Sequence, residues 1–426
     1  MRVFFNNKTV KNASWIIGCR ILQAICALLI NMFTARYLGP SNFGLINYAA
    51  SLVAFLSPLM TLGISSILVN EIVTHPDQEG EVVGTSMLLC IVSSIFCIVG
   101  LGAFVMVAHP GEKDTLIVCF LYSLLLISKG IELIQYWFQA KLWSKYVSVS
   151  MLIVYLVVSA YKVFLLLTGK SIYWFSLSYA IEYFLIAIAL LVVYKNKKGP
   201  QLKFSFNVAK RLIGRGKHFI IADIMGVVLA QSDKIMLKSM IGNAEVGFYA
   251  AAWSIANITN FVFAAIIDSM RPVIFNLKRI DEALYKEKVS KLFGIVIYLS
   301  LAQSIFIACL AKPIVYIMYG KAYSEVTPIL QIVIWYTSFS YIGAVRGVWL
   351  LAEEKQKYLW QISLIGMIAN IVLNFVFIPW LGAIGAAIAT LITQILANVV
   401  FNFLVKPMRE VNLLILKGMD IRKLIK

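Results

Sequence analysis

Long apolar stretches alternate with short polar connections along almost the whole chain. Their length is informative because an α-helix rises about 1.5 Å per residue, so that about 20 apolar residues cross a hydrocarbon layer of about 30 Å. The pattern predicts twelve membrane-spanning helices, with residues 311–325 ambiguous between a span and a connection. The predicted spans are 13–35, 43–70, 85–108, 115–139, 147–168, 171–194, 217–241, 246–270, 291–311, 325–351, 357–379 and 382–405.

The composition agrees with a lipid-embedded chain. Of its 426 residues, 61% are hydrophobic and 14% are charged, whereas soluble domains carry about 45–50% apolar and about 25% charged residues. All six cysteines lie inside apolar stretches without a CxxC pair, so we interpret them as small hydrophobic residues. The N-terminal segment is basic but lacks a clear cleavage site, so we expect the first span to be retained.

Basic residues are concentrated in alternate connections. Lys and Arg accumulate in cytoplasmic loops of membrane proteins. The distribution of the 38 Lys and Arg residues therefore predicts that both termini are cytoplasmic, and it accounts for the net charge of +18 without a nucleic-acid partner. The basic residues predicted on the outer side are Arg36, Lys113, Lys170, Lys238, Lys312 and Lys321.

A basic segment at 195–216 divides the chain almost in half. We therefore expect an N-terminal six-helix bundle at 1–194, a cytoplasmic linker at 195–216, a C-terminal six-helix bundle at 217–406 and a cytoplasmic tail at 407–426. Within the linker, the stretch 204–213 fits either a basic amphipathic helix on the anionic inner leaflet or a solvated connection.

The two halves share a glycine-containing connection after their first predicted span. Gly39 and Gly44 match Gly242 and Gly247, each pair being 203 residues apart. Glycine permits positive φ in a tight turn, and small residues let two helices approach closely. Because this repeat covers six helices, an even number, both halves have the same membrane orientation, as in transporters that rock one half against the other around a substrate.

Polar side chains inside predicted spans are costly in lipid and therefore mark candidate functional positions. Those on the first and seventh spans fall within an arc of roughly 80° at about 100° per residue, so we expect both polar faces to line an aqueous cleft. The candidates from all spans are Arg20, Asn31, Lys129, Glu132, Asp223, Gln231, Lys234 and Arg346.

Some charges inside spans also fit ion pairs that serve the structure alone. Lys129 and Glu132 are three residues apart, a spacing at which two side chains meet along one helix. Lys162 and Glu182 lie in neighbouring spans and fit an ion pair between two helices. Each pair would neutralise its own charges without a ligand.

Further polar residues lie in the second half of the chain. Asp233 and Asp268 fit solvated positions near the membrane interface, where a carboxylate remains in contact with water. The eleventh span adds the uncharged polar residues Asn370 and Asn374.

Sequence motifs for catalysis are missing. There is no HExxH, DxD, GxSxG or glycine-rich phosphate loop, and the three histidines lie far apart. We therefore expect a protein that is not an enzyme and that has no metal site and no cofactor. A membrane glycosyltransferase or polymerase is the less favoured alternative, because it needs a large loop with catalytic residues.

The whole chain resembles polysaccharide-biosynthesis flippases of the O-antigen type, a family of the multidrug/oligosaccharidyl-lipid/polysaccharide exporter superfamily. Three motifs carry the resemblance: Leu38-Gly39-Pro40-Ser41-Asn42-Phe43-Gly44; Gln231-Ser232-Asp233-Lys234 with Glu245-Val246-Gly247-Phe248-Tyr249; and Leu381-Gly382-Ala383-Ile384-Gly385-Ala386-Ala387.

The resemblance implies an all-α membrane protein with twelve transmembrane helices in two six-helix bundles, V-shaped around a central cavity, as in multidrug and toxin extrusion transporters. The implied function is flipping of an undecaprenyl-diphosphate-linked oligosaccharide, an O-antigen or capsule repeat unit, across the bacterial inner (plasma) membrane by alternating access. The implied partners are this substrate, membrane lipid, an H⁺ or Na⁺ counter-ion and the polysaccharide polymerase machinery. A drug or cation antiporter on the same fold is the alternative, and it would favour an acidic, aromatic lumen.

From their positions on the helix faces, we assign the candidate residues to substrate binding or to ion coupling. We expect a partly cationic cleft, because guanidinium and ammonium groups bind phosphate oxygens by charge-assisted hydrogen bonds. The residues assigned to substrate binding are Arg20, Asn31, Lys129, Gln231, Lys234 and Arg346, and those assigned to ion coupling are Asp223 and Glu132.

Overall fold

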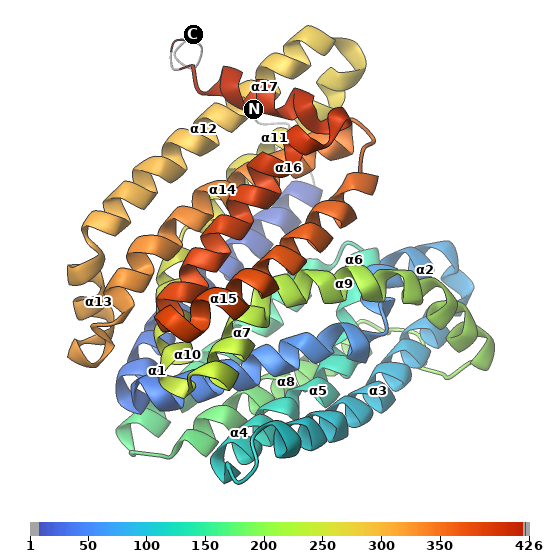
Figure 1. The fold of residues 1–426 in the computed structure, drawn as a ribbon. Coiled ribbons are helices and arrows are strands. Elements are labelled where there is room, and N and C mark those ends of the chain that lie inside the picture. The colour runs from blue at the N-terminus through green and yellow to red at the C-terminus, as the bar shows by residue number, and fades with distance from the viewer. Residues whose placement is uncertain (1–7, 421, 423–426) are drawn as a thin grey trace. The chain divides into compact units, whose positions relative to one another are not determined.

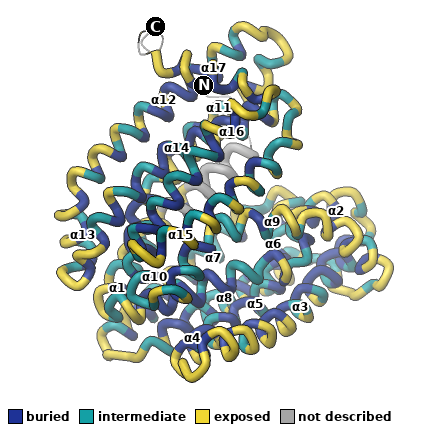
Figure 2. Tube along the Cα trace, viewed as in Figure 1, coloured by how far each residue is buried: buried dark blue, intermediate teal, exposed yellow. Residues whose placement is uncertain are grey.

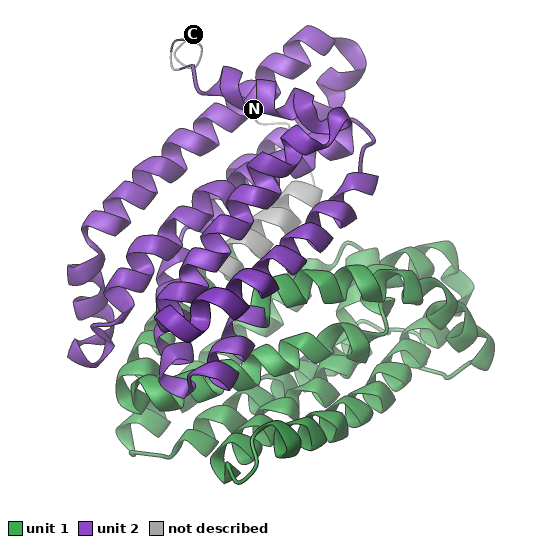
Figure 3. Ribbon diagram, viewed as in Figure 1, with its two compact units in different colours: residues 1–231 green, residues 232–426 purple. Residues whose placement is uncertain are grey.

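Helices form the regular structure throughout the part of the chain that the computed structural model describes, which is residues 8–420 and 422, apart from the side chains of 8–17, 20 and 21. These residues contain no strand, so the predicted all-α class is confirmed (Figure 1). The chain divides into two compact units, unit 1 at residues 1–231 and unit 2 at residues 232–426 (Figure 3). Helix α9 (Phe206–Met240) contains the boundary and contributes to both units.

Unit 1 is a bundle in which α1 packs along α7, and α5 packs against both α3 and α8. Helices α4, α5 and α6 follow one another within one apolar span, Lys113–Ala140, and α5 and α6 carry polar residues into the bundle. Before α9, its helices are α1 (Lys8–Thr61), α2 (Leu68–Thr74), α3 (Glu79–Ala108), α4 (Lys113–Ser123), α5 (Leu125–Glu132), α6 (Gln135–Ala140), α7 (Ser144–Leu167) and α8 (Ile172–Asn196).

Unit 2 is built around α14, which packs against α10, α12 and α15. Its core includes Phe293 of α12 and Trp349 of α14, both buried. The helices after α9 are α10 (Asn243–Ala256), α11 (Asn260–Ile280), α12 (Glu282–Cys309), α13 (Ala311–Tyr319), α14 (Val326–Ala352), α15 (Lys357–Ile395), the π-helical turn Leu396–Val400, α16 (Phe401–Leu404) and α17 (Arg409–Gly418).

Glycines with positive φ interrupt the helical path where the sequence repeat predicts hairpins. Gly39 has a φ of 72° inside α1, and Gly242 has a φ of 142° between α9 and α10. Gly382 adds a third break, with a φ of 56° inside α15. Side chains with a Cβ are strained in this region of φ. The predicted turns at Gly39 and Gly242 are therefore confirmed.

Nine helices in the described part of the chain are long and apolar enough to cross a membrane. Large apolar side chains on them are exposed, including Phe96 at 73% and Trp380 at 85%. Figure 2 shows exposed positions recurring along these helices. Exposed apolar surface of this extent needs a nonpolar environment. The chain is a multi-pass membrane protein.

The predicted span 43–70 is too long at its C-terminal end. Helix α1 ends at Thr61, and α2 begins at Leu68 after a turn in which Gly63 has a φ of 67°. A Cβ on Gly63 would lie 2.2 Å from the carbonyl oxygen of Gly216, so close backbone packing fixes the turn. Apolar composition alone carries no signal for such a contact between distant segments.

Two more segments differ from a simple span. The predicted span 246–270 is divided, because α10 ends at Ala256 and α11 begins at Asn260. The ambiguous segment 311–325 forms α13 and a 3₁₀ turn, Lys321–Tyr323, in place of a full-length span.

The first turns of α9 are tied to α2 through one buried carboxylate. Glu71 is fully buried and contacts both Arg211 and Arg215, the Arg211 Nε to Glu71 Oε2 distance being 3.1 Å. Arg211 also donates to Gln78 at 3.0 Å. Most of the basic stretch 204–213 is therefore helical, because α9 begins at Phe206. Arg211 within the stretch and Arg215 just after it both bind Glu71.

We expect Gly382→Ala to lower the melting temperature by about 3–10 °C, because strained backbone of this kind costs about 1–3 kcal/mol. A Cβ there would also lie 2.6 Å from Glu245 Oε2, which accepts a hydrogen bond from Ala383 N. Thermal unfolding of the purified protein measures the effect. Gly347→Ala is the control, since no atom lies within 4 Å of its added Cβ; equal shifts in the two variants would contradict the prediction.

Candidate functional site

A pocket of about 470 Å³ in unit 1 brings together three of the residues predicted from the sequence. Lys129 and Glu132 come from α5, and Asp223 comes from α9. We call it the lysine pocket; its other polar lining residues are Ser57, Thr61, Ser65, Gln135 and Tyr136.

The two charged residues of α5 bind uncharged partners. Lys129 Nζ donates to Ser57 Oγ at 3.1 Å, and Glu132 Oε1 accepts from Gln135 Nε2 at 3.1 Å. An ammonium group has three donors and a carboxylate has about four acceptor sites. The two side chains also interact electrostatically with each other. With one hydrogen bond each, both half-buried groups keep hydrogen-bonding capacity for a ligand in the pocket.

Glu132 also lines a second pocket in unit 1, with a volume of about 340 Å³. We call it the tyrosine pocket, because Tyr155 of α7 and Tyr183 of α8 form its wall beside Glu182 and Gln23. The Nζ atom of Lys129 lies 5.9 Å from the centroid of the Tyr183 ring. The two pockets therefore share a carboxylate and lie around the same lysine.

The expected ion pair of Lys162 with Glu182 is confirmed. Lys162 Nζ lies 3.6 Å from Glu182 Oε2 and 3.9 Å from the centroid of the Tyr179 ring. Burial of this pair is tolerated because a carboxylate and an aromatic face both offset the charge of the lysine. Lys162 thus has a local structural partner.

Unit 2 contains a buried carboxylate whose position the sequence interpretation placed wrongly. Asp233 is 3% exposed, so the expected solvated position near an interface is wrong. Its Oδ2 accepts from Thr390 Oγ1 at 2.7 Å and from the Tyr249 hydroxyl, and its Oδ1 accepts from Asn374 Nδ2 at 2.6 Å. Three neutral donors from α10 and α15 thereby satisfy the acid inside the helix packing.

Asn370 extends this group, accepting from Ser232 Oγ at 2.7 Å and from Asn374 Nδ2 at 3.0 Å. We call Asp233, Tyr249, Asn370, Asn374 and Thr390 the aspartate cluster. The Oδ1 atom of Asn374 is buried and has no hydrogen-bond partner within the described residues. Carboxylate, amide and hydroxyl oxygens together are the ligand types that hard cations prefer.

A signal for this cluster was present in the sequence. Asn370 and Asn374 are four residues apart and so lie on one face of α15. Only the fold shows that this face meets Asp233. Asp268, by contrast, is 63% exposed and pairs with Arg271 at 3.0 Å, so it lies on the surface of unit 2; its solvation near the membrane interface stays a prediction.

Arg346 lies within helix packing in unit 2. It is 4% exposed, and its Nη1 atom donates to the Ala397 carbonyl and lies 3.4 Å from Asn402 Oδ1. Ala397 belongs to the π-helical turn Leu396–Val400, where the hydrogen-bonding ladder of a regular α-helix is interrupted. In this structure the guanidinium group therefore supports an irregular helix.

The remaining predicted residues are dispersed. Gln231 Oε1 accepts from Ser51 Oγ at 3.0 Å in unit 1, and Asn31 is half-buried on α1. Lys234 is half-buried on α9, next to Asp233 in the chain. Arg20 lies in α1, and its side chain falls outside the described residues.

The sequence matches a known protein family over most of its length. A family model described as "Polysaccharide biosynthesis protein" matches residues 9–278, which is more than half of the chain. The chain belongs to the polysaccharide biosynthesis protein family. The resemblance carried by the three sequence motifs is therefore confirmed.

Similar proteins support this family membership. The capsular polysaccharide biosynthesis protein CapF of Staphylococcus aureus is 24% identical over 93% of this chain and 99% of its own length. Two solved structures share the fold. The lipid II flippase MurJ, in an inward closed conformation, has a TM-score of 0.71 at 13% identity, covering 95% of this chain and 90% of its own. An inward-facing multidrug-resistance MATE family transporter has a TM-score of 0.66 at 14% identity, covering 92% and 95%.

In this polysaccharide biosynthesis family protein, Arg346→Ala is expected to lower the free energy of unfolding by about 1.5–3 kcal/mol, because hydrogen bonds of a buried charged group are lost. Chemical denaturation of the purified protein measures the change. Arg271→Ala is the matched control, expected to cost about 0–1 kcal/mol because its ion pair is exposed. If the variant is as stable as the unaltered protein but no longer exports polysaccharide, Arg346 binds substrate as the sequence predicts.

Proposed function

We propose that this protein flips an undecaprenyl-diphosphate-linked oligosaccharide, an O-antigen or capsule repeat unit, from the inner to the outer face of the bacterial inner membrane by alternating access. The lysine pocket is the observation that carries the proposal. The names of CapF and of the lipid II flippase support the class of substrate. Flipping makes and breaks no covalent bond in the substrate, so the protein acts as a transporter and needs no catalytic group.

The chemistry of the lysine pocket suits the sugar–phosphate part of such a substrate. Sugar hydroxyls both donate and accept hydrogen bonds. Glu132 and Asp223 can accept from them, while Gln135 can donate an amide hydrogen. Lys129 supplies the positive charge that binds a phosphate oxygen. Because the pocket has two carboxylates and one lysine, it suits the sugars of the substrate better than the diphosphate. The diphosphate would bind at the edge of the pocket, beside Lys129.

We propose twelve membrane spans in two six-helix bundles, with both termini in the cytoplasm. The nine long apolar helices support this number when two of them are divided at Gly39 and Gly382. Helix α9 supplies the twelfth span. Its content of apolar residues is reduced by the polar side chains of Asp223, Gln231 and Lys234, which is expected of a helix that lines an aqueous passage.

We infer that the counter-ion, H⁺ or Na⁺, binds at the aspartate cluster rather than at Asp223 and Glu132. Asp233 is buried and accepts hydrogen bonds from three neutral donors, and the charge of the neighbouring Lys234 also acts on it. A proton or a cation bound in the cluster would offset the charge of the carboxylate further. The buried Asn374 Oδ1 offers one more oxygen beside it. Asp223 and Glu132 instead line pockets large enough for an organic substrate.

The polysaccharide polymerase machinery is the proposed downstream partner. A repeat unit delivered to the outer face is the substrate that a polymerising step there requires. A complex of the two would shorten the path of the lipid-linked intermediate between them.

A drug or cation antiporter is the second candidate, and the tyrosine pocket favours it. Glu132, Glu182, Tyr155 and Tyr183 form an acidic and aromatic lining, which attracts organic cations through charge and through the faces of the rings. The ion pair of Glu182 with Lys162 reduces this attraction, because it cancels one of the two negative charges. The family membership therefore decides in favour of the lipid-linked substrate.

We expect Lys129→Gln to lower surface polysaccharide about tenfold and to accumulate lipid-linked repeat units on the inner face. The substitution removes a charge-assisted hydrogen bond to phosphate, which corresponds to about tenfold in affinity. Immunoblots of polysaccharide and extraction of lipid-linked sugars measure the two effects at matched protein level. Lys113→Gln is the control, because this lysine is exposed and lies outside both pockets. Normal polysaccharide with lost resistance to cationic dyes would support the antiporter.

Asp233→Asn is expected to make polysaccharide export insensitive to collapse of the ion gradient and to slow it at least about tenfold, because the amide cannot balance the charge of a bound ion or carry the proton. Export with and without protonophore or sodium ionophore tests this. Asp268→Asn is the control at an exposed acid. Full ionophore sensitivity in the Asp233 variant would rule out coupling at the aspartate cluster.

A further inference from the structure

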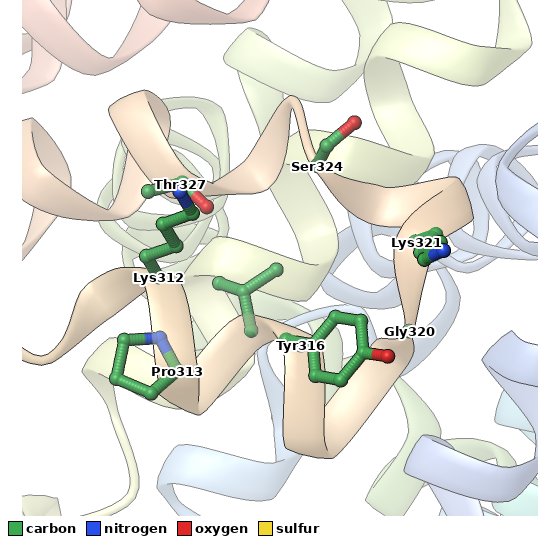
Figure 4. A pocket seen from close by; sticks show the side chains of 8 residues that line it. Lys312, Pro313, Tyr316, Gly320, Lys321, Ser324 and Thr327 are labelled. Atoms are coloured by element: carbon green, nitrogen blue, oxygen red, sulfur yellow. The ribbon is translucent and has the colours of Figure 1, made fainter.

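One end of unit 2 carries a pocket that the transport site does not use. The pocket has a volume of about 770 Å³ and is formed by α13, the 3₁₀ turn Lys321–Tyr323 and the start of α14 (Figure 4). Gly320, with a φ of 79°, turns the chain after α13 so that the following residues fold back beside it. We call it the α13 pocket.

This pocket lies at the end of unit 2 that faces away from the C-terminal helix. Ser290, near the start of α12, donates to the Leu414 carbonyl of α17, whereas α13 follows the far end of α12 (Figure 1). The 28 residues of α12, at about 1.5 Å each, correspond to about 40 Å, enough to span the membrane. With a cytoplasmic C-terminus, the α13 pocket therefore opens at the outer leaflet.

Two lysines flank the pocket on the side of the membrane where basic residues are few. Lys312 and Lys321 both line it, and both are exposed. Neither takes part in an ion pair with another described residue. They are two of the six basic residues predicted outside, and neither forms a salt bridge to a described acid, including the exposed Glu325 that follows Ser324.

The remaining lining combines apolar walls with hydroxyl groups. Pro313 and Tyr316 form the apolar part, and Figure 4 shows the Tyr316 ring lying between Pro313 and Gly320. Ser324 and Thr327 add hydroxyls on the facing segment. Such a lining matches an amphiphile, because it offers charge and hydrogen bonds to a headgroup and an apolar wall to a chain.

We propose that the α13 pocket binds an anionic phospholipid of the outer leaflet, with the phosphate between Lys312 and Lys321 and the upper acyl chain along Tyr316. Charge complementarity selects an anionic headgroup over a zwitterionic one, since the two ammonium groups form no salt bridge within the described residues. A free phosphate ion would leave the apolar wall unused. Tyrosine is also the residue type that favours the level of the headgroups. The site is separate from both transport pockets and does not depend on what is flipped.

The test uses the full-length protein in nanodiscs of equal parts phosphatidylglycerol and phosphatidylcholine, with retained lipids counted by native mass spectrometry. The double variant Lys312→Gln/Lys321→Gln is expected to lower the retained ratio of phosphatidylglycerol to phosphatidylcholine about tenfold, because each lysine near the surface attracts an anionic lipid. Lys113→Gln/Lys170→Gln is the matched control, with the same loss of charge at two exposed lysines predicted on the same side. This control is expected to change the ratio less than about twofold.

Tyr316→Ser tests the apolar part of the site, because Tyr316 is exposed and its loss leaves the fold intact. It is expected to reduce retention of phosphatidylglycerol, while added inorganic phosphate at millimolar concentration leaves retention unchanged. An unchanged ratio in the Lys312/Lys321 variant, or an equal loss in the control, would overturn the proposal. Displacement of the lipid by inorganic phosphate, with no effect of Tyr316→Ser, would identify a phosphate site and would also overturn it. Lipid binding is measured without transport, so failure here leaves the flippase proposal untouched.

Discussion

Polar groups inside a nonpolar medium must find partners within the protein, and this requirement governs the whole molecule. Helices meet it for the backbone, and short contacts meet it for the buried charges. Lys162 binds Glu182, Asp233 binds three neutral donors, and Arg346 binds the carbonyl oxygen of Ala397. Two breaks inside the long helices α1 and α15 occur at glycines because only glycine adopts positive φ without strain.

The ligand-binding roles that we propose fall to the places where this pairing is incomplete. Lys129 and Glu132 each form one hydrogen bond to an uncharged partner, interact electrostatically with each other and line pockets large enough for a ligand. The α13 pocket is a second such place, with two lysines beside an apolar wall. The aspartate cluster differs from both because it is dense and buried, and it suits a small ion better than a sugar. The three proposed sites are therefore chemically distinct and would not compete for one ligand.

Part of the candidate site could be predicted from the sequence and part could not. Lys129, Glu132 and Asp223 were identified because charges are rare in lipid-spanning helices, and the structure places all three in one pocket. The role expected for Arg346 followed from the same rule, but the rule does not distinguish a side chain facing water from one bonded to a helix carbonyl. Asp233 was misjudged for the same reason, since its burial depends on Tyr249 and Thr390, which come from different helices.

The order of amino acids alone dictates the all-α membrane class, the family and the glycine turns, because lipid imposes a strict length and polarity pattern on each helix and because positive φ favours glycine. Packing between helices settles where the helices end and which polar groups meet. Helix α1 stops at Thr61 because Gly63 packs on Gly216, far away in the chain. Contacts between distant segments leave no periodic trace in a single sequence, and it is these contacts that separate a buried structural charge from one that can bind a ligand.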